Sequence, residues 1–202
     1  MSQNTPRTLV IGTGNKHKVQ EIVPLLSGLN LVLKAATDYG PFAPVEHGLT
    51  LEANAMIKAN AALELSGEWS ISDDTGLEVD ALGGRPGIYA ARYAGEGCTF
   101  ADNIRKMLGE LAGVPVEKRA ARFACVIAFC RPGYEPQTFR GECLGNIALA
   151  PVGEGGFGYD PIFIETSLQK TFAQMTAEEK NRISHRSIAV KKCKDFLVNI
   201  QK

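Results

Sequence analysis

Apolar positions along the chain repeat with strand spacing in some segments and with helix spacing in others. The short apolar run Thr8 to Ile11 predicts a first strand. The apolar stripe at 19–26 predicts a helix next, which Pro24 must bend or shorten. A second helix is expected to begin after Thr50, a good N-cap, and to stop at Gly67.

The second half of the chain continues the alternation. A helix is predicted over about Phe100 to Ala112, and the apolar runs Phe123 to Phe129 and Gln137 to Cys143 flank a Pro-Gly turn typical of an antiparallel hairpin. No repeat, low-complexity tract or long linker interrupts residues 1–202. The pattern therefore predicts a single α/β domain with a mixed sheet.

Composition adds limits on partners and on compartment. Lysine plus arginine equals aspartate plus glutamate at 22 each, so we expect no nucleic-acid partner and no membrane partner. The five cysteines, at 98, 125, 130, 143 and 193, lack CxxC spacing and are expected to be buried thiols of a reducing compartment. The stretch Met1 to Arg7 is polar and no apolar run approaches bilayer length, which predicts a soluble, cytoplasmic protein.

The most informative polar feature is the acidic pair in Ile71-Ser72-Asp73-Asp74-Thr75-Gly76. It follows a short apolar run and precedes a glycine, which predicts the end of a strand. Adjacent strand residues point to opposite faces, so one carboxylate can enter a site while its neighbour turns toward the scaffold. Such a pair can hold a hard cation or accept a proton from water, and Thr75 adds a hydroxyl. The alternative is an Asx-type turn.

Two glycine-bearing segments are candidates for ligand contact. The run Thr13-Gly14-Asn15-Lys16-His17-Lys18 precedes the first helix, where backbone amides and the helix dipole favour an anion. A glycine turn capped by Asn15 explains it equally well, and both the dinucleotide fingerprint and the P-loop spacing are missing. The segment Gly155 to Pro161 places two aromatic residues among glycines, which suits either an aromatic wall for a base or a plug of the core.

Charged residues near the C-terminal helices have simpler explanations too. Thr176 to Glu179 is a capping box that starts a helix. Ser184 can cap a last helix, with His185 and Arg186 in its first turn, where a cation is unfavourable unless an acceptor compensates. A local backbone hydrogen bond for His185 and a surface ion pair of Arg186 with Glu178 or Glu179 are the alternatives. No nucleophile-elbow context supports covalent catalysis.

Five segments in order, over nearly the whole chain, resemble the non-canonical purine nucleoside triphosphate pyrophosphatases, which act on inosine and xanthosine triphosphates. They are 13–18, Ser72 to Leu77, Leu82 to Arg92, Gly156 to Pro161 and Glu179 to Arg186. The resemblance implies a mixed twisted sheet flanked by helices, with two lobes around a central substrate cleft, and a homodimer. It further implies magnesium-dependent hydrolysis of ITP, dITP and XTP to monophosphate and pyrophosphate, which cleanses the nucleotide pool.

With this resemblance, site roles can be assigned. Asp74 is expected to be the catalytic base and a Mg²⁺ ligand, with Glu46 as a candidate second ligand. Phosphate contacts are assigned to Thr13, Gly14, Asn15, Lys16, His17, Lys18 and Thr75. The base end is assigned to Phe157, Gly158, Tyr159, Asp160, Lys180, His185 and Arg186.

The chain departs from the family pattern at one point. The family commonly has Phe-x-Glu-Asn-Ala where this sequence reads Leu51-Glu52-Ala53-Asn54-Ala55, so the glutamate stands one position early, about 100° around the helix. Glu46, Glu52 and Asp73 therefore all stay open as the second metal ligand. A modified-pyrimidine nucleotide pyrophosphatase and a nucleotide sensor without turnover are the alternative functions, and the means of rejecting GTP is not evident.

Overall fold

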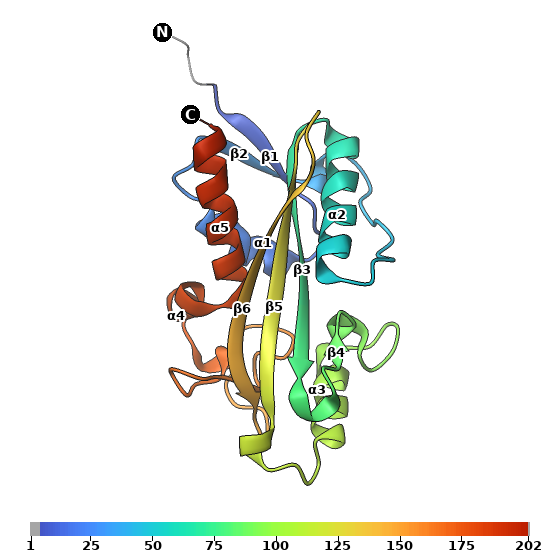
Figure 1. Ribbon diagram of the computed structural model, residues 1–202, viewed down its shortest axis with the longest axis vertical. Helices are drawn as coiled ribbons and strands as arrows, with labels where there is room; N and C mark the ends of the chain where they lie inside the picture. Colours follow the sequence, from blue (N-terminus) through green and yellow to red (C-terminus); the bar gives the residue numbers. More distant parts are fainter. Residues whose placement is uncertain (1–4, 202) are drawn as a thin grey trace. The chain divides into compact units, whose positions relative to one another are not determined.

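Five helices and a seven-stranded mixed sheet make up the computed structural model, which describes residues 5–201 (Figure 1). The strands are β1 (Arg7–Ile11), β2 (Leu31–Ala35), β3 (Trp69–Val79), β4 (Pro86–Gly87), β5 (Ala120–Cys130), β6 (Gln137–Ile147) and β7 (Phe163–Glu165). The helices are α1 (Lys16–Leu25), α2 (Leu51–Ser66), α3 (Phe100–Glu110), α4 (Ala177–Ile183) and α5 (His185–Ile200). The predicted α/β fold with a mixed sheet and flanking helices is confirmed.

Strand pairing explains why the sheet is mixed. The hydrogen-bonded order is β2-β1-β3-β5-β6-β7, with β4 paired to β3. Strand β1 runs parallel to both β2 and β3, whereas β3 with β4 and β6 with β7 are antiparallel. The two runs predicted as a hairpin are adjacent strands, β5 and β6, each longer than the sequence suggested.

The chain forms two compact units, and neither is continuous in sequence. Unit 1 comprises residues 1–74, 125–141 and 186–202, and unit 2 comprises residues 75–124 and 142–185. The chain passes between them four times, at 74/75, 124/125, 141/142 and 185/186. No single cut in the chain separates the two units.

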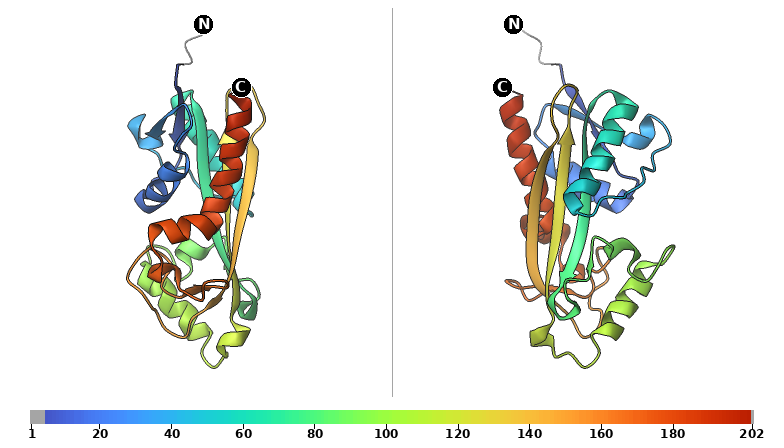
Figure 2. Two further views of the ribbon diagram at one scale, coloured as in Figure 1. Left: turned by 90° about the vertical axis from the view of Figure 1, so that its left-hand side faces the viewer. Right: turned by 45° about the vertical axis from the view of Figure 1, so that its right-hand side comes forward.

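Unit 1 buries both faces of its strands. On β1, Leu9 and Ile11 face a cluster formed with α1 and α5, while Val10 faces the opposite side and contacts Ala62 of α2. Helices α5 and α2 accordingly cover opposite faces of these strands (Figure 2). A strand buried on both sides reads as a continuous apolar run rather than an alternating one, as Thr8 to Ile11 does.

The predicted limits of α2 are confirmed. The Thr50 hydroxyl accepts a hydrogen bond from the Ala53 amide at 3.1 Å, and Gly67 ends the helix at φ 72°. In α1, the Asn15 side chain caps the first turn, and the helix ends at Leu25 directly after Pro24. The helix therefore ends one residue after Pro24, which agrees with the prediction that this proline shortens it.

Unit 2 has its own aromatic core. Phe123, Phe163 and Phe172 lie with ring centroids 4.6–5.9 Å apart. Helix α3 adds the fully buried Met107, and a capping box between Thr99 and Asp102 starts this helix. The capping box predicted at Thr176 to Glu179 starts α4.

One prediction about β3 is wrong. The sequence suggested that the strand ends at the acidic pair, but β3 continues for five residues beyond Asp74 to Val79. The segment after Gly76 is apolar at Leu77 and Val79, both fully buried, and β4 pairs with Leu77 and Glu78. This partner strand compensates for the weak strand preference of glycine, so the Asx-type turn does not form.

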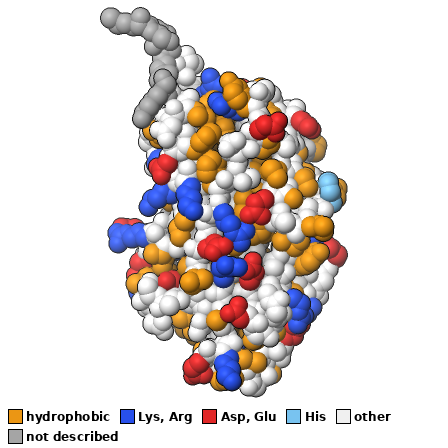
Figure 3. Space-filling model, viewed as in Figure 1, with side chains coloured by type: hydrophobic (Ala, Val, Ile, Leu, Met, Phe, Trp, Pro, Cys, Tyr) orange, Lys and Arg blue, Asp and Glu red, His pale blue; other side chains and the backbone are white. Residues whose placement is uncertain are grey.

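The balance of positive and negative residues in the sequence is visible on the surface. Acidic and basic side chains are interspersed on the face in Figure 3. All five cysteines are free thiols, of which Cys98 alone is partly exposed. Within residues 5–201 no helix is long and apolar enough to cross a membrane. The first four residues of the polar stretch Met1 to Arg7 lie outside the described residues.

Candidate functional site

The two neighbouring carboxylates of β3 meet different sets of cations in unit 1. Asp73 is fully buried, with Lys18 Nζ 3.0 Å and Arg186 Nη2 3.2 Å from its Oδ2. Asp74 Oδ1 instead accepts a hydrogen bond from Lys58 Nζ at 2.8 Å. Lys18 and Arg186 belong to the α1 and α5 side of the sheet, and Lys58 belongs to α2 on the other side. The predicted opposite orientation of the pair is confirmed.

Asp73 acts as part of the scaffold. Burial alone would raise the pKa of Asp73, but attraction by Lys18, Arg186 and Lys58 outweighs burial and holds this pKa well below its ordinary value. The same attraction raises the pKa of Arg186, which also binds Glu21. Asp73 is therefore a permanently charged anchor for α1 and α5.

Asp74 has the opposite electrostatic character. Burial raises the pKa of Asp74, and its neighbours Lys58 and Lys18 offset this only in part. The side chain is buried, yet its Oδ2 has no hydrogen-bond partner among the described residues. A buried carboxylate oxygen without a donor is costly unless a ligand, a cation or a water satisfies it.

Lys58 links Asp74 to a second carboxylate. Its ammonium lies 3.1 Å from Glu46 Oε1 and 2.8 Å from Asp74 Oδ1, and only 9% of the lysine side chain is exposed. Burial acts to lower the pKa of Lys58, but the surrounding carboxylates outweigh burial and raise it. Glu52 instead pairs with Arg140 at 3.0 Å, so Glu46 is the glutamate that stands with Asp74.

This donor set fits a magnesium ion. Mg²⁺ takes one or two protein carboxylates and completes its octahedral shell with waters and substrate phosphates. Asp74 and Glu46 meet that requirement, and the unsatisfied Oδ2 of Asp74 is a suitable ligand atom. No group of three or more His, Cys, Asp or Glu residues suited to a metal occurs in 5–201, so the protein alone would supply a partial shell.

The turn before α1 adjoins the acidic pair through the sheet. The Gly12 amide donates to Ile71 O at 2.7 Å, and the Ser72 hydroxyl donates to Gly12 O at 2.5 Å. Asn15 Oδ1 accepts hydrogen bonds from the amides of His17 and Lys18, so the cap predicted as one interpretation of this segment is confirmed.

The other predicted phosphate contacts lie around this cap. Thr13 is half-buried and its hydroxyl accepts from the Asn15 amide at 3.2 Å, whereas Gly14, Lys16 and His17 are exposed. Thr75 is half-buried on β3, as the first residue of unit 2. Phosphate binding by these residues stays a prediction.

In unit 2, Asp160 ties the glycine-rich loop to α4. Its Oδ2 accepts a hydrogen bond from the Phe157 amide at 2.8 Å and from Lys180 Nζ at 2.6 Å. A Cβ on Gly156 would come within 2.1 Å of the same oxygen, so this close approach requires glycine. The Lys180 ammonium lies 5.2 Å from the Phe157 ring centroid. Phe157 and Gly158 are half-buried, and the Asp160 carboxylate links the loop backbone to α4.

Two residues assigned to the base end are buried in the aromatic core of unit 2. Tyr159 donates its hydroxyl to Ala90 O at 2.9 Å, which fits the interpretation that this ring fills the core. His185 stacks on Phe123 with centroids 4.5 Å apart and planes at 10°. His185 is the last residue of unit 2, and Arg186 is the first residue of the final segment of unit 1. These two adjacent residues therefore belong to different units.

The surface ion pair considered for Arg186 is wrong. Arg186 is 2% exposed and binds Asp73 and Glu21. Glu178 pairs with Arg182 and Glu179 with Lys170. The buried Asp73 and the half-buried Glu21 are the acceptors that offset the cost of a cation in the first turn of α5.

Sequence reasoning missed Lys58 and Glu21. Lys58 lies on the buried stripe of α2 between Ala55 and Ala62, and a lysine within an alanine stripe was the available signal. A lysine in such a position must find buried carboxylates or extend to solvent. Glu21 had no comparable signal, because it lies among polar residues of α1.

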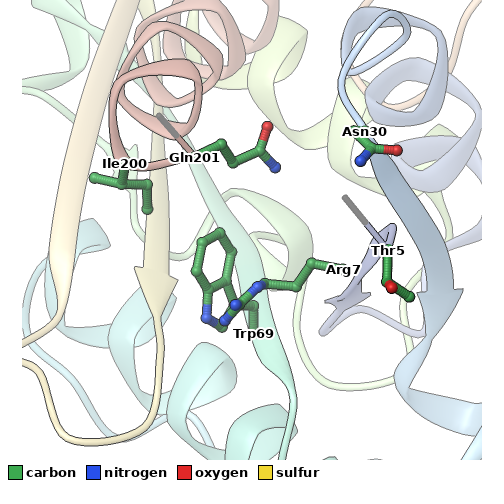
Figure 4. Close-up of a pocket in the computed structure, with 6 residues that line it drawn as sticks. All are labelled: Thr5, Arg7, Asn30, Trp69, Ile200 and Gln201. Carbon is green, nitrogen blue, oxygen red and sulfur yellow. The ribbon is translucent and has the colours of Figure 1, made fainter. Parts of the chain in front are cut away.

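A separate pocket of unit 1 contains none of the predicted site residues (Figure 4). It has a volume of about 140 Å³ and is lined by Thr5, Arg7, Asn30, Trp69, Ile200 and Gln201. The Arg7 guanidinium lies over the Trp69 ring, 4.2 Å from its centroid. Asp74 and its partners lie elsewhere in unit 1, so this pocket is not the candidate site.

Comparisons with known proteins identify the family of this chain. The model of the Ham1 family matches residues 9–196. Proteins named dITP/XTP pyrophosphatase are 46% identical over 190 residues in Geobacter sulfurreducens and 47% identical over 193 residues in Shigella flexneri. These matches cover 94% and 95% of this chain, and 96% and 98% of the relatives.

Solved structures of Ham1 proteins have a fold similar to that of this chain. One from Coxiella burnetii has a TM-score of 0.88 at 36% identity and covers 96% of this chain and 99% of its own. One from Staphylococcus aureus has a TM-score of 0.85 at 39% identity and covers 96% of this chain and 100% of its own. Sequence and fold similarity extend over nearly the full length, and the chain belongs to the Ham1 family.

Proposed function

We propose that this protein hydrolyses ITP, dITP and XTP to the monophosphate and pyrophosphate, with Mg²⁺, and so removes deaminated purines from the nucleotide pool. The relatives from Geobacter sulfurreducens and Shigella flexneri carry the name dITP/XTP pyrophosphatase and match over nearly the full chain. The observation that carries the proposal is Asp74, a buried carboxylate with a raised pKa and an oxygen without a partner beside Glu46 and Lys58. Perturbed, buried acids of this kind are typical of reaction centres.

The residues of unit 1 account for phosphate chemistry. A bound Mg²⁺ would supply neutralising charge on the phosphates, with Asp74 and Glu46 holding it. Asp74 accepts the proton of the attacking water as this water approaches the α-phosphorus. Lys18 and Lys58 place two cations next to the acidic pair, where they favour a polyanionic substrate. The α1 N-terminus adds a favourable dipole.

The residues of unit 2 account for base selectivity. Phe157 offers a ring face for the purine, and the Lys180 ammonium is a donor whose position Asp160 fixes. Hypoxanthine and xanthine carry a 6-keto acceptor for such a donor, whereas adenine presents an amino group there. A donor facing a donor leaves both unsatisfied, which gives strong discrimination.

A substrate panel tests the proposal. Purified protein with MgCl₂ is given ITP, dITP, XTP, ATP, GTP and a modified pyrimidine triphosphate, and the released pyrophosphate is measured. We expect the highest kcat/KM for the first three. A preference for the pyrimidine would identify the alternative pyrophosphatase, and ITP binding in calorimetry without pyrophosphate release would identify a sensor.

We further propose that the protein works in the cytoplasm as a homodimer. The free thiols of all five cysteines support a reducing compartment. The dimer follows from the family resemblance of the sequence. Light scattering coupled to gel filtration tests it, and a mass of one chain at working concentration would contradict it.

A further inference from the structure

The ammonium of Lys58 lies between Glu46 Oε1 and Asp74 Oδ1, where a divalent cation could bridge the same two oxygens. It lies within 3.1 Å of an oxygen of each carboxylate, on a side chain that is 9% exposed. Mg²⁺ binds carboxylate oxygens at about 2.0–2.1 Å. An ion bridging Glu46 Oε1 and Asp74 Oδ1 would therefore occupy the space that the ammonium fills.

We infer that Lys58 is a built-in counter-cation of the nucleotide-free protein, and that a divalent cation bridging Glu46 Oε1 and Asp74 Oδ1 binds by displacing its ammonium. The inference rests on the proposed function only for the choice of Mg²⁺ as the cation. Lys58 is thus a positioning residue, because it holds the two carboxylates together before metal and substrate arrive.

Charge around the acidic pair supports this inference. Among the described residues, ion pairs within unit 1 join the carboxylates of Glu21, Glu46, Asp73 and Asp74 to the cations of Lys18, Lys58 and Arg186. With the Lys58 ammonium withdrawn, the surroundings of Asp74 become more negative by one charge, and the two oxygens that the ammonium contacts become available. The triphosphate offers the withdrawn ammonium a new partner, so metal and nucleotide would bind together.

The test measures Mg²⁺ binding without nucleotide. Titration calorimetry with MgCl₂ is done on the wild type, on Lys58→Met and on Lys18→Met. Both variants remove one positive charge near Asp74, but Lys18→Met leaves the Lys58 bridge in place. We expect weak binding by the wild type and a Kd for Lys58→Met lower than that of Lys18→Met by about tenfold, because only the contacting lysine competes for the ligand atoms.

Equal Mg²⁺ affinity of the two variants would overturn the inference, because general charge would then explain the whole effect. A second measurement follows the Lys58 ammonium signal of the wild type in ¹H–¹⁵N spectra. The Lys58→Arg variant, which lacks this signal, is used only to assign it. In the wild type this signal should move when MgCl₂ is added with pyrophosphate and stay in place with MgCl₂ alone at the same concentration. A signal unmoved by both additions would also overturn the inference. Neither readout uses ITP turnover, so failure of the substrate panel would be a separate result.

Discussion

Asp73 and Asp74 carry the same side chain at adjacent positions, and their surroundings shift their pKa values in opposite directions. Three cations outweigh burial at Asp73, whereas burial outweighs the cations at Asp74, where Glu46 adds repulsion. Environments that push two like acids apart assign them different roles. Asp73 pairs with the cations of α1 and α5, and Asp74 is the residue that we propose for the chemistry.

Asp74→Asn should lower kcat for ITP by about 10²–10⁴-fold, the usual contribution of a general base. The amide has nearly the same volume, so the fold should persist. Pyrophosphate release measures the loss, and Asp195→Asn on the exposed side of α5 is the matched control. A near wild-type kcat in the Asp74 variant would remove Asp74 from its assigned role.

Arg186→Ala should destabilise the protein by about 3–5 kcal/mol, because it weakens the pairing of a fully buried carboxylate. Urea unfolding followed by circular dichroism measures the change. Arg182→Ala breaks an exposed pair with Glu178 and should cost about 0–1 kcal/mol. Similar losses in the two variants would mean that Arg186 contributes little to holding Asp73.

At the scale of elements, prediction from sequence succeeded where local chemistry sets the limit. Thr50 and Gly67 define α2 because a hydroxyl cap and a left-handed glycine act within one turn. The prediction from sequence failed at Gly76, because pairing with β4 continues strand β3 beyond this residue. Local sequence carries no information about a partner strand formed by a later turn.

In the candidate site, too, contacts between neighbouring residues were predictable and contacts between distant residues were not. The cap at Asn15 was predictable from neighbouring residues. The bridge from Lys58 to Glu46 depends on how the segment 36–50 folds back along α2, and the bond from Arg186 to Asp73 spans 113 residues. Such distant contacts leave only a lysine in an alanine stripe, or a basic residue at a helix start, as traces in the sequence.

The capping box of α3 gives a pH-dependent prediction. Hydrogen bonds from Thr99 lower the pKa of Asp102 to about 2, from an ordinary value of 3.8. A lowered pKa contributes stability that is fully present above the ordinary value and is lost as the pH falls through the lowered one. Asp102→Ala should therefore lower the melting temperature at pH 7, and the difference from wild type should shrink between about pH 4 and pH 2. Thermal unfolding at several pH values checks this, and a constant difference would contradict it.

At the scale of the whole molecule, burial separates the thiols into two classes. Cys125, Cys130, Cys143 and Cys193 are at most 6% exposed, and Cys98 is partly exposed. Burial raises the pKa of Cys130 to about 11 and that of Cys193 to about 12, which suppresses the reactive thiolate.

A thiol reagent such as Ellman's should therefore react quickly with one thiol per native chain, and with all five in denaturant. Cys98→Ser should abolish the fast reaction, because it removes the one accessible sulfur. A fast reaction with two or more thiols in the native protein would show that a buried segment opens readily.

The discontinuous make-up of unit 1 affects how the chain folds as it leaves the ribosome. Its first segment, 1–74, is synthesised well before α5, which belongs to its last segment, 186–202. A nascent chain can pair Asp73 with Lys18 early, but the guanidinium that completes this pairing is 113 residues away. The apolar face of β1 and β3 that α5 covers must wait as well. Nascent chains thus expose this hydrophobic surface until α5 is synthesised, which favours aggregation or chaperone binding in that interval.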